Sequence, residues 1–99
     1  MEYRAWITIP GLALEREDRW EPFIERMERD HADDLGPTLG WDTPDLAYVV
    51  LSVEGRSRSA AAATMVEAIT ETLQAVGLDD LAPTAIRFEG AAPAEPVAA

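Results

Sequence analysis

The fold of this chain is decided by the stretch from Leu46 to Gly77. It opens with the apolar run Leu46-Ala47-Tyr48-Val49-Val50-Leu51-Ser52-Val53, turns at Gly55 and continues into a long alanine-rich segment. A short apolar run rich in β-branched residues is typical of a strand buried on both faces, so we expect a central strand here. Apolar residues at helical spacing follow, which predicts a helix capped by Ser57 or Ser59. Its expected core positions are Ala62, Val66, Ile69, Leu73 and Val76, with Met65 beside them.

Weaker patterns on either side predict four further elements. Residues 3–9 alternate between apolar and polar side chains, as a strand with one core face does, and residues 38–43 and 84–89 predict two shorter strands. A helix is expected to begin between Asp18 and Glu21 and to end at Leu35-Gly36-Pro37. Its apolar stripe comprises Trp20, Phe23, Ile24, Met27 and His31.

The resulting order is β-α-β-β-α-β. With short connections and right-handed crossovers, this order predicts an α+β fold of the ferredoxin-like kind, a two-layer βαββαβ sandwich. Its antiparallel sheet has the spatial order 4-1-3-2, and both helices lie on one face. The order places the first and third strands, which are the most apolar, in the middle of the sheet.

The length of 99 residues suits one hydrophobic core. We expect residues 1–89 to form a single α+β domain. From Gly90 to Ala99 the chain consists mostly of alanine and proline, a composition that cannot bury enough apolar surface to order itself. The sequence therefore predicts a disordered, mobile tail over residues 90–99.

Charge is the strongest compositional feature. The chain carries 19 acidic residues against 8 basic ones, all arginine, for a formal charge of −11. Affinity for nucleic acid comes mainly from Lys and Arg side chains that displace counterions, and anionic membrane surfaces select the same residues. The composition therefore argues against direct binding to nucleic acid or a membrane, and the field of such a charge would attract a basic protein or a metal ion. The competing account is that the charge keeps a small domain soluble.

The residue types present in the chain argue against several other classes of site. The chain has no cysteine, which excludes disulfides, thiolate metal ligands and thiol nucleophiles. It has no glycine-rich phosphate loop and no nucleophile elbow, and we expect no cofactor. A membrane-spanning helix needs about 18 consecutive apolar residues, and no apolar run in the chain approaches that length. The first residues, Met1-Glu2-Tyr3-Arg4, lack the features of a secretory signal. We expect a cytoplasmic protein.

The sheet face turned away from the helices is the first candidate site. Aromatic and valine side chains on a bare sheet face are typical of an interaction surface. Self-association, docking of another protein, and coverage by the chain's own tail or by residues 10–17 are the three alternatives. The residues expected on this face are Arg4, Trp6, Thr8, Trp41, Tyr48, Val50 and Arg87.

Two protein families share this topology. The aromatic residues on the central strands resemble the base-stacking residues of RNA-recognition domains. The strand from Leu46 to Glu54 lacks that family's glycine–aromatic pattern and its basic residues, which argues against RNA binding. Dimeric α+β barrel proteins are similar in topology as well, and that likeness implies a homodimer formed through the sheet face or a sheet edge.

The second candidate site is the acidic stretch Asp30-His31-Ala32-Asp33-Asp34. On a helix, Asp30 and Asp34 are neighbours, as are His31 and Asp34, so Asp30, His31 and Asp34 are candidate ligands of a hard cation. His31, the single histidine, is also the candidate general base. The competing account is structural: a charged histidine is favoured at a helix C-terminus beside carboxylates.

The leading hypothesis from these observations is a non-enzymatic, acidic interaction or regulatory module that forms a homodimer and binds another protein. The alternative is an enzyme or small-ligand binder of the dimeric α+β barrel kind, with its pocket between helix and sheet. That pocket would use His31 with Arg4 or Arg87 as polar groups, and would be walled by Trp6, Trp41 and Tyr48. In a third hypothesis, the acidic helix face mimics nucleic acid and binds a basic protein.

Overall fold

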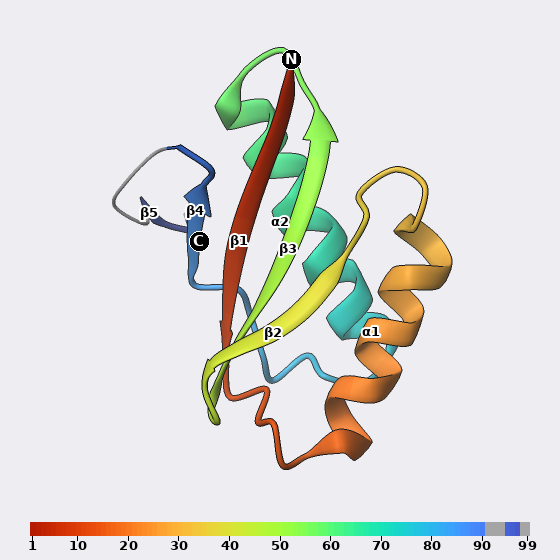
Figure 1. The fold of residues 1–99 in the computed structure, drawn as a ribbon. Helices are drawn as coiled ribbons and strands as arrows, with labels where there is room; N and C mark the ends of the chain where they lie inside the picture. The colour runs from red at the N-terminus through yellow and green to blue at the C-terminus, as the bar shows by residue number, and fades with distance from the viewer. Residues whose placement is uncertain (91–94, 98–99) are drawn as a thin grey trace.

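The computed structural model of this protein describes residues 1–90 and 95–97. It is an α+β fold with four antiparallel strands in one sheet, two helices, and a short fifth strand at the sheet edge (Figure 1). The elements in chain order are β1 (Glu2–Pro10), α1 (Glu17–His31), β2 (Thr38–Thr43), β3 (Leu46–Glu54), α2 (Arg58–Ala75), β4 (Ala85–Phe88) and β5 (Glu95–Pro96).

The strands are arranged in the order β2-β3-β1-β4-β5, and every neighbouring pair is antiparallel. The two most apolar strands, β1 and β3, are therefore the central ones, and their nine residues pair in full from Glu2 opposite Glu54 to Pro10 opposite Leu46. Since directly paired residues point to the same face of a sheet, this register puts Ala5 with Leu51 and Ile7 with Val49.

Both helices cover that same face. Figure 1 shows α2 behind β1 and β3, with α1 beside it. The core between sheet and helices includes Phe23 and Met27 of α1, and Met65, Ile69 and Leu73 of α2. Each of these five side chains is at most 1% exposed. At about 1.5 to 3 kcal/mol for each fully buried aliphatic or aromatic side chain, this layer is a major stabilising contribution to the fold.

The start of helix α2 agrees with the sequence prediction, but the side of the helix that faces the core does not. Ser57 is the N-cap, as expected, and its hydroxyl accepts a hydrogen bond from the Ala60 N–H at 3.1 Å. The expected core stripe is partly wrong, because Ala62, Val66 and Val76 are only half-buried. The buried positions of α2 are Ala61, Met65, Ala68, Ile69, Thr72 and Leu73. The helix is therefore rotated relative to the expectation, and its Ala62–Val66 side lies at the edge of the core.

The helix α1 begins at Glu17 and ends at His31, earlier at both ends than the sequence suggested. The N–H groups of Leu35 and Gly36 both donate to the His31 carbonyl oxygen, at 2.9 and 3.1 Å, and so close the turn after the helix. Gly36 has a φ of 55°, a left-handed conformation in which glycine avoids the steric cost of a side chain.

The C-terminal segment contributes to the sheet. Glu95 and Pro96 pair with Ile86 and Ala85 of β4, and the Val97 N–H donates to the Thr84 carbonyl oxygen at 3.0 Å. The sequence did not predict this pairing, and the mobile tail over residues 90–99 stays a prediction. Of the predicted tail, residues 91–94 and 98–99 lie outside the described residues. Among the described residues, no helix is long and apolar enough to cross a membrane.

Candidate functional site

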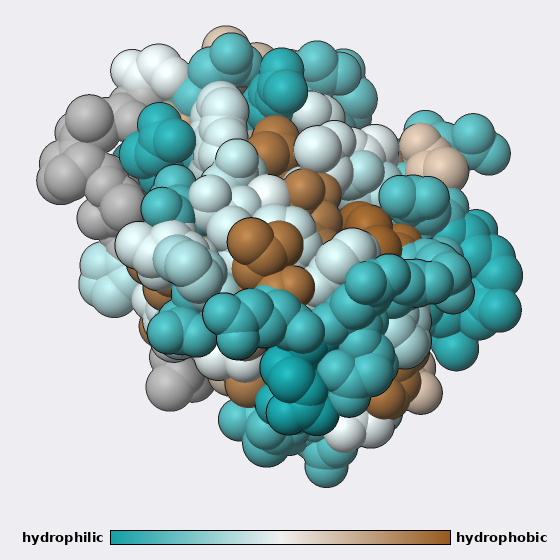
Figure 2. All heavy atoms as spheres, turned by 60° about the horizontal axis from the view of Figure 1, so that its bottom comes forward, coloured by the Kyte–Doolittle hydropathy of each residue, from teal (hydrophilic) through white to brown (hydrophobic). Residues whose placement is uncertain are grey.

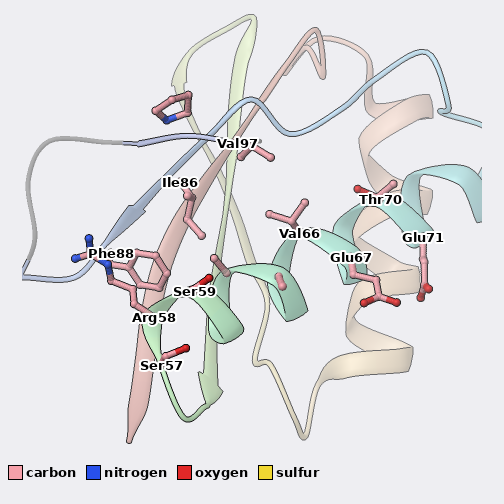
Figure 3. A pocket seen from close by; sticks show the side chains of 13 residues that line it. Ser57, Arg58, Ser59, Val66, Glu67, Thr70, Glu71, Ile86, Phe88 and Val97 are labelled. Carbon is pink, nitrogen blue, oxygen red and sulfur yellow. The ribbon is translucent and has the colours of Figure 1, made fainter. Parts of the chain in front are cut away.

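A groove lies between α2 and the β4–β5 edge of the sheet (Figure 3). It has a volume of about 900 Å³, which is near the upper end of the range for small-molecule sites. The lining residues are Ser57, Arg58, Ser59, Ala62, Ala63, Val66, Glu67, Thr70, Glu71, Ile86, Phe88, Pro96 and Val97. We call this hollow the α2–β4 groove.

The groove exists because α2 packs on β3 and β1 rather than over β4. Ile86 and Phe88 point to the helix side of β4, where they form the floor, and each is at most 5% exposed. Small side chains on the facing side of α2, Ala62 and Ala63, leave the space above that floor empty. Val97, which is half-buried against the core, closes the outer side.

The groove is elongated along α2. Its lining on the helix runs from Ser57 to Glu71, so at about 1.5 Å of rise per residue it follows α2 for about 20 Å. Figure 3 shows Val66, Ile86 and Val97 in the middle, with polar groups toward the two ends. The Arg58 guanidinium lies 5.4 Å from the centre of the Phe88 ring at one end. Glu67, Thr70 and Glu71 lie at the other end, and both glutamates are exposed.

The opposite face of the sheet, which no described helix covers, holds six of the seven residues expected there. At its centre, Trp6 of β1 is paired with Val50 of β3 and Arg87 of β4. Two guanidiniums pack against the Trp6 ring, Arg87 at 4.6 Å and Arg4 at 5.6 Å from its centre. Neither of these two arginines has a carboxylate within ion-pair distance among the described residues.

The apolar groups of this open sheet face largely cover one another. Val50 is only 8% exposed although no helix lies over it. The Tyr48 ring lies across Gly40 of β2, where an added Cβ would be 2.5 Å from the ring. In Figure 2, which turns the lower end of the sheet toward the viewer, hydrophobic residues form small separate groups among hydrophilic ones. Trp6 and Tyr48 are half-buried, so part of each ring stays accessible on this face.

Trp41 is the residue whose expected place was wrong. It is paired with Ala47, which is fully buried on the helix side, so its side chain points toward the helices and not to the open face. Its ring packs edge-on against Trp20 at 5.3 Å, and its indole N–H donates to the Leu12 carbonyl oxygen at 2.8 Å. Trp41 is thus part of the packing between α1 and β2.

Two carboxylates of the acidic stretch at the end of α1, those of Asp30 and Asp34, lie beside basic side chains of the same chain. Asp30 accepts a hydrogen bond from Arg26 at 2.7 Å and has Arg29 at 3.6 Å. The Arg26 guanidinium lowers the pKa of the Asp30 carboxyl. His31 Nδ1 is 3.3 Å from Asp34. Among the described residues, no three carboxylate or histidine side chains are grouped to hold a metal ion.

The pocket expected in the enzyme hypothesis does not assemble. Trp6, Tyr48 and both arginines lie on the open face, Trp41 lies under α1, and His31 is at the end of that helix. None of them lines the α2–β4 groove. The helix side of the groove includes part of the run Ala60-Ala61-Ala62-Ala63, which did not by itself predict a binding site.

No protein-family model, curated protein or solved structure matches this chain.

Proposed function

We propose that this protein is a non-enzymatic binding module that holds an elongated apolar molecule in the α2–β4 groove. The observation that carries the proposal is the groove itself, about 900 Å³ in volume and with apolar residues along its middle. Burial of apolar ligand surface contributes about 25 cal/mol for each Å², so a chain-like molecule lying on Ile86, Phe88 and Val66 would displace water favourably.

The residues that line the groove favour binding over catalysis. Its lining contains no histidine and no cysteine, and its two serines flank the start of α2, where the Ser57 hydroxyl is engaged as the helix cap. A nucleophile needs a base within hydrogen-bond reach, and the lining has no histidine to serve Ser59. A binding role uses the apolar walls and requires no reacting group.

Titration of the full-length, ¹⁵N-labelled chain with 1-octanol tests the proposal. We expect saturable amide shifts at Ala62, Ala63, Val66 and Phe88, and none of similar size at Trp6 or Tyr48 on the open face. An Ala63→Trp variant fills the groove and should lose the response. Ala75→Trp, the same replacement at an exposed position of α2 outside the groove, should keep it.

Two outcomes would contradict the proposal. The first is the lack of any saturable shift in the wild-type chain. The second is an Ala63→Trp variant that has the helix content of the wild type by circular dichroism and binds octanol as well as the wild type does.

Self-association through the open sheet face is a second candidate, and it accommodates the interaction-module hypothesis. The observation in its favour is that Trp6 and Tyr48 are half-buried on a sheet face that carries no described helix. A partner chain would complete their burial. Light scattering should then show a dimer for the wild type and a shift toward monomer for Trp6→Ala; a monomeric wild type at high concentration contradicts it. A dimer that Trp6→Ala leaves intact forms through another surface.

Two further predictions stay proposals. The order β2-β3-β1-β4 reads 4-1-3-2 from the other edge and supports the ferredoxin-like sandwich as the fold class. Mimicry of nucleic acid by the acidic helix layer has the charge of −11 in its favour. Such a complex with a basic protein would weaken steeply with salt, because exposed charges are screened over about 8 Å at physiological ionic strength.

A further inference from the structure

We infer that the ligand of the α2–β4 groove is an amphipathic cation, an elongated apolar body with one ammonium or guanidinium head, whose head lies between Glu67 and Glu71. This inference rests on the proposed function, because it names the chemical class of the molecule that the groove would hold.

Glu67 and Glu71 give one end of the groove a negative charge. Glu67 and Glu71 are four residues apart on α2, so their carboxylates are neighbours on one side of the helix. Neither is part of an ion pair among the described residues, whereas Asp18, Asp30 and Asp80 each pair with an arginine. Like charges at this spacing destabilise a helix, and a cation between them would remove that repulsion.

The Phe88 ring at the other end of the groove sets the orientation of the ligand. It is an apolar surface with the Arg58 guanidinium 5.4 Å from its centre, so the apolar end of the ligand is directed toward it. Thr70, between the two glutamates in the sequence and also in the lining, offers a hydroxyl that can accept a hydrogen bond from an ammonium head. The three apolar residues Val66, Ile86 and Val97 lie between the two ends (Figure 3).

The electrostatic field of the whole molecule acts in the same direction as the two glutamates. With a formal charge of −11, the protein attracts cations and repels anions over a distance of the order of the Debye length. A long-chain carboxylate would be repelled by the net charge of the protein and by the two glutamates. A long-chain ammonium would be attracted by both.

A series of three probes with one alkyl chain separates the head-group preference from apolar binding. The full-length chain is titrated at pH 7 and low salt with n-octylamine, which is protonated, with neutral 1-octanol and with anionic octanoate, and binding is followed by the amide shifts of the groove residues. We expect octylammonium to bind most tightly and octanoate least. The double variant Glu67→Gln/Glu71→Gln should bind octylammonium about fivefold more weakly and leave octanol binding unchanged, since an exposed charge pair contributes up to about 1 kcal/mol.

The matched control is Glu25→Gln/Glu28→Gln, which changes the net charge by the same amount at exposed positions of α1 outside the α2–β4 groove. It should bind octylammonium as the wild type does. If 1-octanol binds in the groove and octylammonium binds no more tightly, or if the Glu67/Glu71 variant keeps its full affinity, the cationic head is ruled out while the proposed function stands. If the control loses as much affinity as the Glu67/Glu71 variant, the effect is one of net charge and the inference fails. If none of the three probes gives saturable shifts in the groove, the proposed function fails with it.

Discussion

The two ends of the helix layer are built differently. At the β2 end, Trp20 of α1 packs edge-on against Trp41 of β2, and both indole N–H groups donate to backbone carbonyl oxygens, those of Leu14 and Leu12. At the β4 end, α2 presents Ala62 and Ala63 across from Phe88, and the space between them is the α2–β4 groove. Large side chains with satisfied polar groups close the first end, and small side chains leave the second open.

The loops reinforce this difference. The Gly11 N–H donates to the Asp45 carbonyl oxygen at 3.0 Å and the Leu14 N–H to that of Pro44 at 2.8 Å, so two loops are tied together at the closed end. At the open end, the outer neighbour of β4 is a strand of two residues, one of them Pro96, which has no N–H to donate. The comparison indicates that contacts at the closed end stabilise the packing of α1 on the sheet, whereas the open end has the space that the proposed binding requires.

The largest expected effect is the loss of the closed end in a Trp41→Ala variant. Removing the ring deletes the contact with Trp20 and leaves a cavity beside the buried Leu12, so we expect a loss of about 3 kcal/mol in the free energy of unfolding. Urea denaturation measures it. In a double-mutant cycle with Trp20→Ala, the coupling between the two rings should be about 1 kcal/mol. A loss below about 1 kcal/mol for Trp41→Ala would show that this end is not what holds α1 in place.

A smaller effect should separate two adjacent alanines of α2. Ala61 is 1% exposed in the core, so Ala61→Leu forces its neighbours apart and should cost about 2 kcal/mol. Ala62 lines the groove, so Ala62→Leu has empty space to enter and should change the free energy of unfolding by less than about 0.5 kcal/mol. Urea denaturation of both variants, with the same substitution on the same helix turn, makes the comparison. Equal costs would mean that the groove closes in solution.

The smallest effect concerns acid stability at the start of α1. Arg19 donates two hydrogen bonds to the Asp80 carboxylate, at 2.7 and 2.8 Å, and so ties α1 to the loop after α2. These bonds lower the pKa of Asp80 in the folded chain. The unfolded chain then binds the proton more readily, so the stabilisation is present above about pH 4 and is lost as the pH falls through the folded-state pKa.

An Asp80→Asn variant tests that assignment. It should be slightly less stable than the wild type at pH 7, and the difference should shrink as the pH falls toward 2, as followed by urea denaturation at each pH. Asp33→Asn, which changes an exposed carboxylate that forms no ion pair among the described residues, is the control. A stability difference that is constant with pH would contradict a role for the Arg19–Asp80 pair.

Much of the fold could be predicted from the sequence because its signals are local. Alternation along residues 3–9 and the apolar run after Leu46 defined two strands, and the central position of both followed from their apolarity. The serine before the alanine-rich helix defined its cap. Six of the seven residues expected on the open sheet face lie there, since strand alternation alone determines the face of a residue on a long, regular strand.

The candidate site was missed for reasons that no local signal resolves. Four successive alanines place the same small side chain on every side of a helix and so have no periodicity. The sequence therefore could not show that Ala61 faces the core and Ala62 the groove. Trp41 lies on a short strand with a register shift between Trp41 and Thr43, and a shift of one residue moves a side chain to the other face.

The sequence by itself thus determined the elements, their order and the core faces of the two central strands, because these follow from hydrophobic periodicity and from short connections. Only the tertiary structure decided the rotation of α2, the side of the sheet on which Trp41 packs, and the addition of β5 to the edge of β4. Each of these depends on how much space neighbouring elements leave between them. The α2–β4 groove is that space.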